Sequence, residues 1–215
     1  MQAYGELHFE DFLVRNLFYS IKLNVLGYIE AVGISIPLGF LLGLFPGPKS
    51  FSSKMVNAVR YIPLTAVTGL FIAWFGIEDF MKIQFLAFGI LVYLLPVVVQ
   101  RNLEVDEVYI QTAYTLGASQ WQMIKTVFWP SVISKISDDI RVLIAISWTY
   151  IIVAELVNRT GGIGALIFMS AKQSRVDKVF ALLIVIIAVG YLQDKAFEYF
   201  DKKFFPYKYQ GNGRS

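Results

Sequence analysis

The chain of 215 residues carries a formal net charge of +3, and 56% of its residues are hydrophobic while only 16% are charged. A soluble domain has about 25% charged residues, so the surplus of apolar side chains must face lipid or a partner. Cysteine is absent and His8 is the single histidine, which argues against a metal site and against a cysteine- or histidine-based catalytic centre. The composition indicates a small integral membrane protein and not an enzyme.

Apolar runs of the length that crosses a bilayer occur in five places. In chain order, the expected spans are residues 17–45, 58–75, 82–99, 140–157 and 180–197. Each must be helical, because backbone groups left unpaired in hydrocarbon are energetically costly. The sequence therefore predicts one all-α domain over residues 1–215, a polytopic membrane helical bundle of about five transmembrane helices.

A stripe of small residues marks one face of the first span. Ala31, Ser35, Gly39 and Gly43 recur every four residues. Small residues at this spacing let another helix approach closely. The neighbouring helix belongs either to the same subunit or to a second one.

The polar segment of residues 100–139 sets the orientation when it is placed in the cytoplasm. Most of the 19 lysines and arginines then lie in cytoplasmic segments, as the positive-inside rule requires. Five spans with the C-terminus inside put the N-terminus outside. The C-terminal lysines alternate with aromatic residues, a pattern that suits a lipid bilayer interface and not a nucleic acid.

Two carboxylates fall within the apolar runs, Glu30 in the first span and Glu155 near the outer end of the fourth. Ionisable groups at membrane depth usually face a bundle interior or an aqueous cavity, because lipid exposure costs at least ~2.5 kcal/mol. Glu30 and Glu155 are therefore candidate residues of a translocation path, and Trp148 in the fourth span is a third candidate. The alternative for each carboxylate is a structural hydrogen bond to a neighbouring helix.

The most informative stretch is residues 106–130. Ala113, Leu116, Gly117 and Gln120 share one helical face at spacings of three and four. Gly117 with the following Ala118 is expected to end that helix.

A second helix is expected to start directly afterwards. Ser119 can cap it, and its apolar stripe runs through Val127 and ends at Pro130. The pattern predicts two short helices, joined at Gly117, across the cytoplasmic mouth of the bundle.

These residues resemble the EAA motif of ABC importer permeases, in which Glu-Ala-Ala, a glycine and Ile-x-Leu-Pro follow at fixed spacing. Here Gln111-Thr112-Ala113, Gly117 and Val127-Phe128-Trp129-Pro130 keep the spacing and depart in several residue types. Three further segments resemble the branch that carries nitrate, sulfonates, taurine, bicarbonate or thiamine-precursor pyrimidines. They are Gly33 to Gly39, Trp74 to Ile77, and Ala154-Glu155 with Gly161 to Ile167.

The resemblance implies a type I ABC importer-like fold in the cytoplasmic (inner) membrane, with a cytoplasmic coupling-helix loop. Two ABC ATPase subunits would bind ATP and Mg²⁺, so this chain would hold no cofactor. They would contact Gln111, Thr112, Ala113, Leu116, Gly117, Ala118, Ser119, Val127 and Pro130.

Two further partners are implied. A second permease copy would complete a homodimer, and an extracytoplasmic solute-binding protein would dock outside. Such permeases usually have six spans, and five are predicted here, with none before residue 17. The alternative function is a stand-alone channel or secondary transporter that uses Glu30.

Overall fold

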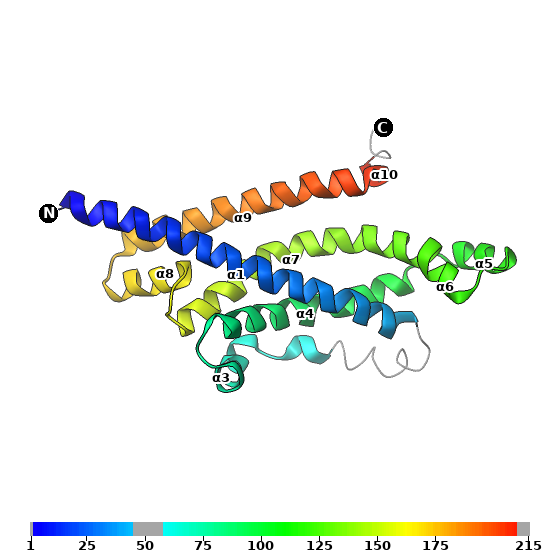
Figure 1. Cartoon of the computed structure of the whole chain (residues 1–215), viewed down its shortest axis with the longest axis horizontal. Helices are drawn as coiled ribbons and strands as arrows, with labels where there is room; N and C mark the ends of the chain where they lie inside the picture. The colour runs from blue at the N-terminus through cyan, green and yellow to red at the C-terminus, as the bar shows by residue number, and fades with distance from the viewer. Residues whose placement is uncertain (1, 45–57, 210–215) are drawn as a thin grey trace. The chain divides into compact units, whose positions relative to one another are not determined.

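The computed structural model describes residues 2–44 and 58–209, with side chains from residue 12 onward except those of 207 and 209. Over these residues the chain is helical and has no strand (Figure 1), which confirms the all-α prediction. The elements are α1 (Gln2–Leu44), η1 (Val59–Tyr61), α3 (Leu64–Phe75), α4 (Asp79–Leu103), α5 (Glu107–Thr115), α6 (Gln120–Met123), η2 (Ile124–Phe128), α7 (Trp129–Val157), α8 (Ile163–Lys172), α9 (Val176–Phe204) and α10 (Pro206–Tyr209).

Four helical segments in the described part of the chain are long and apolar enough to cross a membrane. They are Phe12–Leu44, Asp79–Leu103, Gln120–Val157 and Val176–Phe204. Each contains one of the predicted spans, apart from residue 45 of the first, which lies outside the described residues. Long apolar runs were therefore a sufficient signal for these four helices.

The helix expected over residues 58–75 is shorter than predicted. α3 has 12 residues, or about 18 Å at 1.5 Å per residue, whereas a bilayer core is about 30 Å thick. Pro63 is its N-cap, with φ −67° and ψ 106°, so the backbone before Leu64 is extended. Proline disfavours helical geometry in the residue before it, which explains why the apolar run did not become one long helix.

The helix expected to start at Ser119 is longer than predicted, because it does not end at Pro130. The helical run continues from Gln120 to Val157. Its second part, η2, is a π-helical turn, and the backbone N–H of Trp129 donates to the carbonyl oxygen of Ile124. The wider turn directly before Pro130 accommodates a residue that has no N–H to donate.

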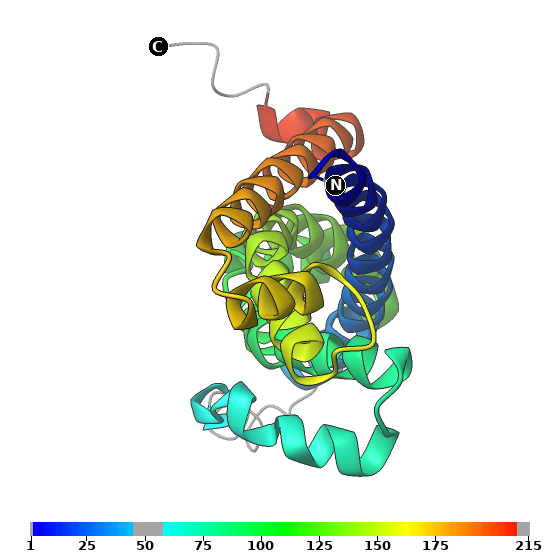
Figure 2. The same ribbon diagram turned by 90° about the vertical axis from the view of Figure 1, so that its left-hand side faces the viewer.

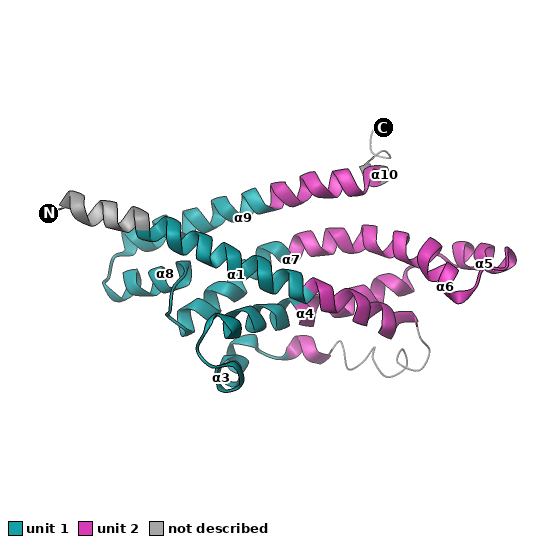
Figure 3. Ribbon diagram, in the orientation of Figure 1, with its two compact units in different colours: residues 1–31, 62–90, 144–193 teal, residues 32–61, 91–143, 194–215 magenta. Residues whose placement is uncertain are grey.

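The described helices divide into two compact units (Figure 3). Unit 1 comprises residues 1–31, 62–90 and 144–193, and unit 2 comprises residues 32–61, 91–143 and 194–215. α1, α4, α7 and α9 contribute residues to both.

The core of unit 1 packs α3 and α7 against α4. Phe71 of α3 meets Phe85 of α4 edge to face, with ring centroids 5.6 Å apart, and Met81 and Ala154 complete the buried cluster. Figures 1 and 2 show α8 lying beside the last turns of α7. This arrangement brings the α7–α8 connection next to buried polar groups of α1.

In unit 2, the last turns of α1 pack closely on α4. A Cβ at Gly39 would lie 2.4 Å from Cγ1 of Val98, and one at Gly43 would lie 3.0 Å from Cβ of Asn102. Ser35 is also fully buried. The predicted stripe of small residues is therefore a contact within this chain.

Candidate functional site

Residues 106–123 form a bent helical pair that we call the elbow. α5 begins at its N-cap Asp106, whose side chain accepts a hydrogen bond from the backbone N–H of Val108 at 2.9 Å. Just before it, Arg101 donates to Glu104 at 2.8 Å, and this hydrogen bond lowers the pKa of the Glu104 carboxyl.

Gly117 makes the bend of the elbow. Its φ is +75°, a left-handed conformation that glycine adopts without a steric cost. The N–H of Gly117 donates to the carbonyl of Tyr114 at 2.9 Å, and that of Ala118 donates to the carbonyl of Ala113 at 3.0 Å. A Cβ at Gly117 would meet no heavy atom within 4 Å, so backbone conformation, and not crowding within the chain, requires a glycine here.

Ser119 starts the next helix, as predicted. Its N–H donates to Oε1 of Gln122 at 2.8 Å, and the N–H of Gln122 donates back to its hydroxyl at 3.4 Å. This reciprocal capping box satisfies two backbone donors at the start of α6. The end of α5 and the start of α6 are thus both defined by local sequence.

The outer side of the elbow exposes several apolar side chains. Leu116 is 82% exposed and Trp121 is 73% exposed, and Val108 and Tyr109 are also exposed. Exposed apolar side chains that gather on one segment are typical of a protein interface. The predicted residues Gln111, Thr112, Leu116, Gly117 and Ser119 are exposed here too, while Ala113 and Ala118 are half-buried.

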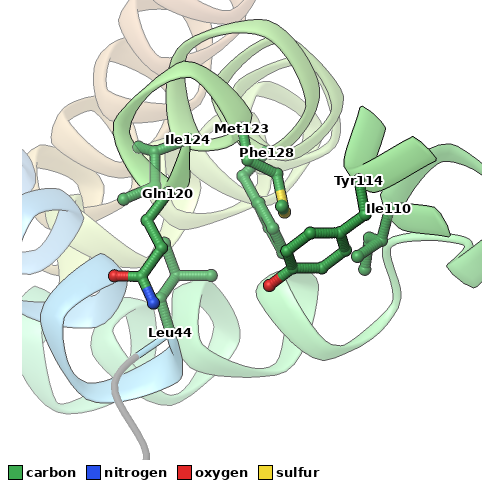
Figure 4. Close-up of a pocket in the computed structure, with 7 residues that line it drawn as sticks. All are labelled: Leu44, Ile110, Tyr114, Gln120, Met123, Ile124 and Phe128. Carbon is green, nitrogen blue, oxygen red and sulfur yellow. The ribbon is translucent and has the colours of Figure 1, made fainter. Parts of the chain in front are cut away.

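The inner side of the elbow is held by apolar contacts around a small cavity of about 170 Å³. Figure 4 shows Ile110 and Tyr114 of α5 facing Met123 and Phe128. Leu44, Gln120 and Ile124 complete the lining. The elbow is therefore anchored on one side and free on the other.

Val127 and Pro130 lie in the elements that follow the elbow. Val127 is a half-buried residue of η2, and Pro130 is an exposed residue in the first turn of α7. They belong to the helix that continues from the elbow.

Glu155 lies in unit 1 and is fully buried. One carboxylate oxygen accepts from the Ser20 hydroxyl at 2.6 Å, and the other accepts from the N–H of Gly164 at 2.8 Å. The N–H groups of the N-cap Gly162 and of Ile163 are satisfied as well, since they donate to Asn16 Oδ1 at 2.7 Å and to Ser20 Oγ at 2.9 Å.

A buried lysine lies in the same unit. Lys82 Nζ donates to Thr160 Oγ1 at 2.9 Å and to the Tyr19 hydroxyl at 3.1 Å, and Tyr19 itself donates to Asp79. The ammonium is also 3.9 Å from Asp79 Oδ1. Buried charges of this kind are stable only when paired and hydrogen-bonded.

Glu30 and Trp148 each have one side-chain partner in unit 1. Gln84 Nε2 donates to both Glu30 oxygens, at 2.8 and 2.9 Å. Trp148 is buried, and its indole N–H donates to Gln193 Oε1 at 2.6 Å. The structure thus keeps Glu30, Trp148 and Glu155 within one unit, each with its own hydrogen bonds.

Sequence reasoning missed the polar residues of α1 that meet these groups. Asn16, Ser20 and Asn24 recur every four residues, and Asn24 Nδ2 donates to Ser147 Oγ at 2.9 Å. This period of four in a span was a readable signal of a polar helix face. Within the described residues, no group of three or more His, Cys, Asp or Glu could hold a metal ion.

The chain matches the family described as "Binding-protein-dependent transport system inner membrane component" over residues 35–206. It is 29% identical to a Bacillus subtilis protein named for aliphatic sulfonates transport, over 97% of this chain and 76% of the relative. It is 26% identical to the taurine transport system permease protein of Escherichia coli, over 91% of this chain and 71% of the relative.

Solved structures show the same fold. A chain of the MetNI methionine ABC transporter, in an inward-facing conformation, superposes with a TM-score of 0.78 at 17% identity, over 91% of this chain and 97% of the other. The architecture is therefore that of the transmembrane subunits of ABC importers.

This chain belongs to the family of binding-protein-dependent transport system inner membrane components. It is the permease subunit of an ABC importer. Family membership supports the importer over the stand-alone channel or secondary transporter that the sequence left open.

Proposed function

We propose that this permease passes a small sulfonate such as taurine across the membrane, and that partner ATPase subunits drive it through the elbow. ATP and Mg²⁺ bind to two partner subunits, and this chain has no cofactor or catalytic role of its own. A second copy of the chain completes the path, and an extracytoplasmic solute-binding protein delivers the solute. The N-terminus is outside and the C-terminus is cytoplasmic.

One observation carries the coupling proposal: a glycine at φ +75° joins two capped helices whose outer side exposes apolar residues. Such a joint has a defined shape, because both helix ends are closed by local hydrogen bonds. Leu116, at 82% exposure, provides apolar area that a partner would bury. A rigid, exposed, apolar elbow suits the transfer of a rigid-body motion from a motor subunit.

The substrate class rests on the relatives, two of which are named for aliphatic sulfonates and taurine. The charged residues within the membrane-spanning helices suit a path that the solute passes through better than a site that binds an anion tightly. Glu30 and Glu155 are acidic, and Lys82 is occupied by Tyr19 and Thr160. We therefore assign most of the selectivity to the solute-binding protein.

Two substitutions of one residue test the elbow. Gly117→Val places a β-branched side chain at a positive φ, which costs at least about 1–2 kcal/mol. Gly117→Asn adds a side chain of similar size that tolerates this conformation. With the complete importer in proteoliposomes, ATP-driven taurine uptake should fall at least tenfold for Gly117→Val and stay within about twofold of wild type for Gly117→Asn.

The same vesicles test the coupling role and the substrate assignment separately. ATP hydrolysis that continues without uptake in Gly117→Val supports the coupling role, whereas normal uptake would refute it. If wild-type vesicles hydrolyse ATP in response to the binding protein but accumulate no taurine or alkanesulfonate, the substrate assignment is wrong and the coupling role stands.

A further inference from the structure

An open groove of unit 2 lies beside the elbow and shares Trp121 with it. Its volume is about 520 Å³, within the range of about 300–1,000 Å³ that is typical of small-molecule sites. α1 contributes Pro37, Phe40, Leu41 and Leu44, and the run from α6 to α7 contributes Trp121, Ile124, Lys125 and Trp129. The lining is apolar except for the lysine ammonium and the indole N–H groups.

The α1 side of the groove, Pro37 to Leu44, belongs to the C-terminal end of the span predicted over residues 17–45. Phe40 packs on Trp129, so the run from α6 to α7 meets α1 near that end, where hydrocarbon gives way to headgroups. Tryptophan is enriched at that boundary, because one part of its ring is apolar and its N–H needs a polar partner.

The two tryptophans have different surroundings. Trp129 packs on Phe40 with ring centroids 5.3 Å apart, so it forms a fixed wall of the groove. Trp121 is 73% exposed and is available to cover an occupant. Ile124 and Lys125 both belong to the π-helical turn, an irregularity that recurs at functional sites in helices.

Lys125 is exposed and, among the residues that the structure describes, is the only charged one that lines the groove. Within residues 12–44, 58–206 and 208, it makes no ion pair or hydrogen bond. A lysine at the headgroup level attracts anionic lipid by about 1 kcal/mol. Its stem can lie along apolar surface while the ammonium reaches a phosphate.

We propose that this groove binds one anionic phospholipid, with an acyl chain along Leu41 and Ile124 and the phosphate at Lys125. An apolar trough that ends in a single cation matches the two parts of such a lipid. The neighbouring cavity shares Leu44 and Ile124 with the groove, so the lipid would lie directly against the elbow's anchored side. Lipid binding here does not depend on which solute the importer carries.

Native mass spectrometry of the full-length permease tests the proposal. The protein, released from detergent, is titrated with dioleoylphosphatidylglycerol and, separately, with dioleoylphosphatidylcholine. We expect one retained phosphatidylglycerol per chain and a preference of about fivefold over phosphatidylcholine, the factor that about 1 kcal/mol gives. Lys125→Gln should abolish the preference. Lys135→Gln removes the same charge from another exposed position on α7 and should leave it unchanged.

Tryptophan quenching gives an independent reading of the location. In a background with Trp74→Phe and Trp148→Phe, which leaves Trp121 and Trp129 of the four tryptophans, brominated phosphatidylglycerol should quench the emission more strongly than brominated phosphatidylcholine does, and Lys125→Gln should equalise the two. Equal binding of the two lipids and equal quenching by them, while Lys125 is in place, would overturn the proposal. A photo-crosslinker at Leu41 that captures residues 45–57 or a second copy of the chain, instead of lipid, would also overturn it.

Discussion

The Glu155 carboxylate accepts a hydrogen bond from the backbone N–H of Gly164, nine residues later, at 2.8 Å. It therefore neutralises the start of α8, where unpaired N–H groups would otherwise attract an anion. Ser20 of α1 donates to the second carboxylate oxygen at 2.6 Å, so one buried side chain joins three elements of unit 1. This geometry favours a structural role for Glu155. That Glu155 lines the translocation path stays a prediction.

The contact between Gly162 and Glu155 predicts that alanine is not tolerated at Gly162. A Cβ there would lie 2.1 Å from the Glu155 carboxylate, and the residue's φ is +98°. Overpacking typically costs about 1–3 kcal/mol, and the positive φ adds about 1–2 kcal/mol. Gly162→Ala should therefore lower the thermal unfolding temperature of the detergent-purified protein strongly.

Gly33→Ala is the matched control. A Cβ at Gly33 meets no heavy atom within 4 Å, and alanine favours a helix interior by about 0.5–1 kcal/mol. We expect its unfolding temperature to be equal to or above that of the wild type. Similar unfolding temperatures for the two variants would contradict the packing around Glu155.

The close approach of α1 to α4 predicts coupling between Gly39 and Val98. Both Cβ and Cγ1 of Val98 lie within 2.5 Å of where a Gly39 Cβ would be. Gly39→Ala should cost about 1–3 kcal/mol of stability. Val98→Gly removes both atoms, so the double variant should be more stable than the sum of the single changes by at least about 1 kcal/mol. Strictly additive effects in chemical denaturation would show that the two residues do not touch.

Hydropathy and residue spacing could predict the long helices and the elbow, because both depend on local sequence. The apolar runs mark α1, α4, α7 and α9, and the pairing of Gly117 with Ser119 marks a helix end and a helix start. Pro63 and Pro130 show the limit of such reasoning. Pro63 stands at the N-cap, where α3 begins, whereas Pro130 follows a π-helical turn inside a helix that continues. Local composition does not distinguish the two outcomes.

The buried polar network could not be predicted in the same way, because its partners are far apart in sequence. Ser20 and Glu155 are 135 residues apart, and Lys82 and Thr160 are 78 apart. Lys82 looked like an ordinary charge at the end of a span. Only packing shows that it is fully buried and shared between α1 and the α7–α8 connection.

The exposure of Leu116 predicts a defect in assembly without a defect in folding. Leu116→Asp changes a side chain that is 82% exposed, so stability should stay within about ±0.5 kcal/mol. Burying the new carboxylate against a partner is costly, so the amount of ATPase that co-purifies should fall at least tenfold.

Met169→Asp is the comparison for that variant. Met169 of α8 is also an exposed apolar residue, but it lies outside the elbow. ATPase co-purification should remain normal for Met169→Asp. Equal losses for the two variants would mean that the elbow is not the docking surface.

Substitutions of Glu30 and of Gln84 show whether Glu30 acts in transport or in stability. Glu30→Gln removes the charge but keeps an oxygen that can accept from Gln84 Nε2, which lies 2.8 Å from Oε1 in the wild type. Gln84→Leu removes the donor and keeps the carboxylate. If Glu30 lines the translocation path, Glu30→Gln should reduce taurine uptake by at least tenfold with little change in unfolding temperature. Gln84→Leu should then lower stability by about 1 kcal/mol with uptake largely retained, whereas parallel losses of stability and uptake in both variants would mark Glu30 as a structural residue.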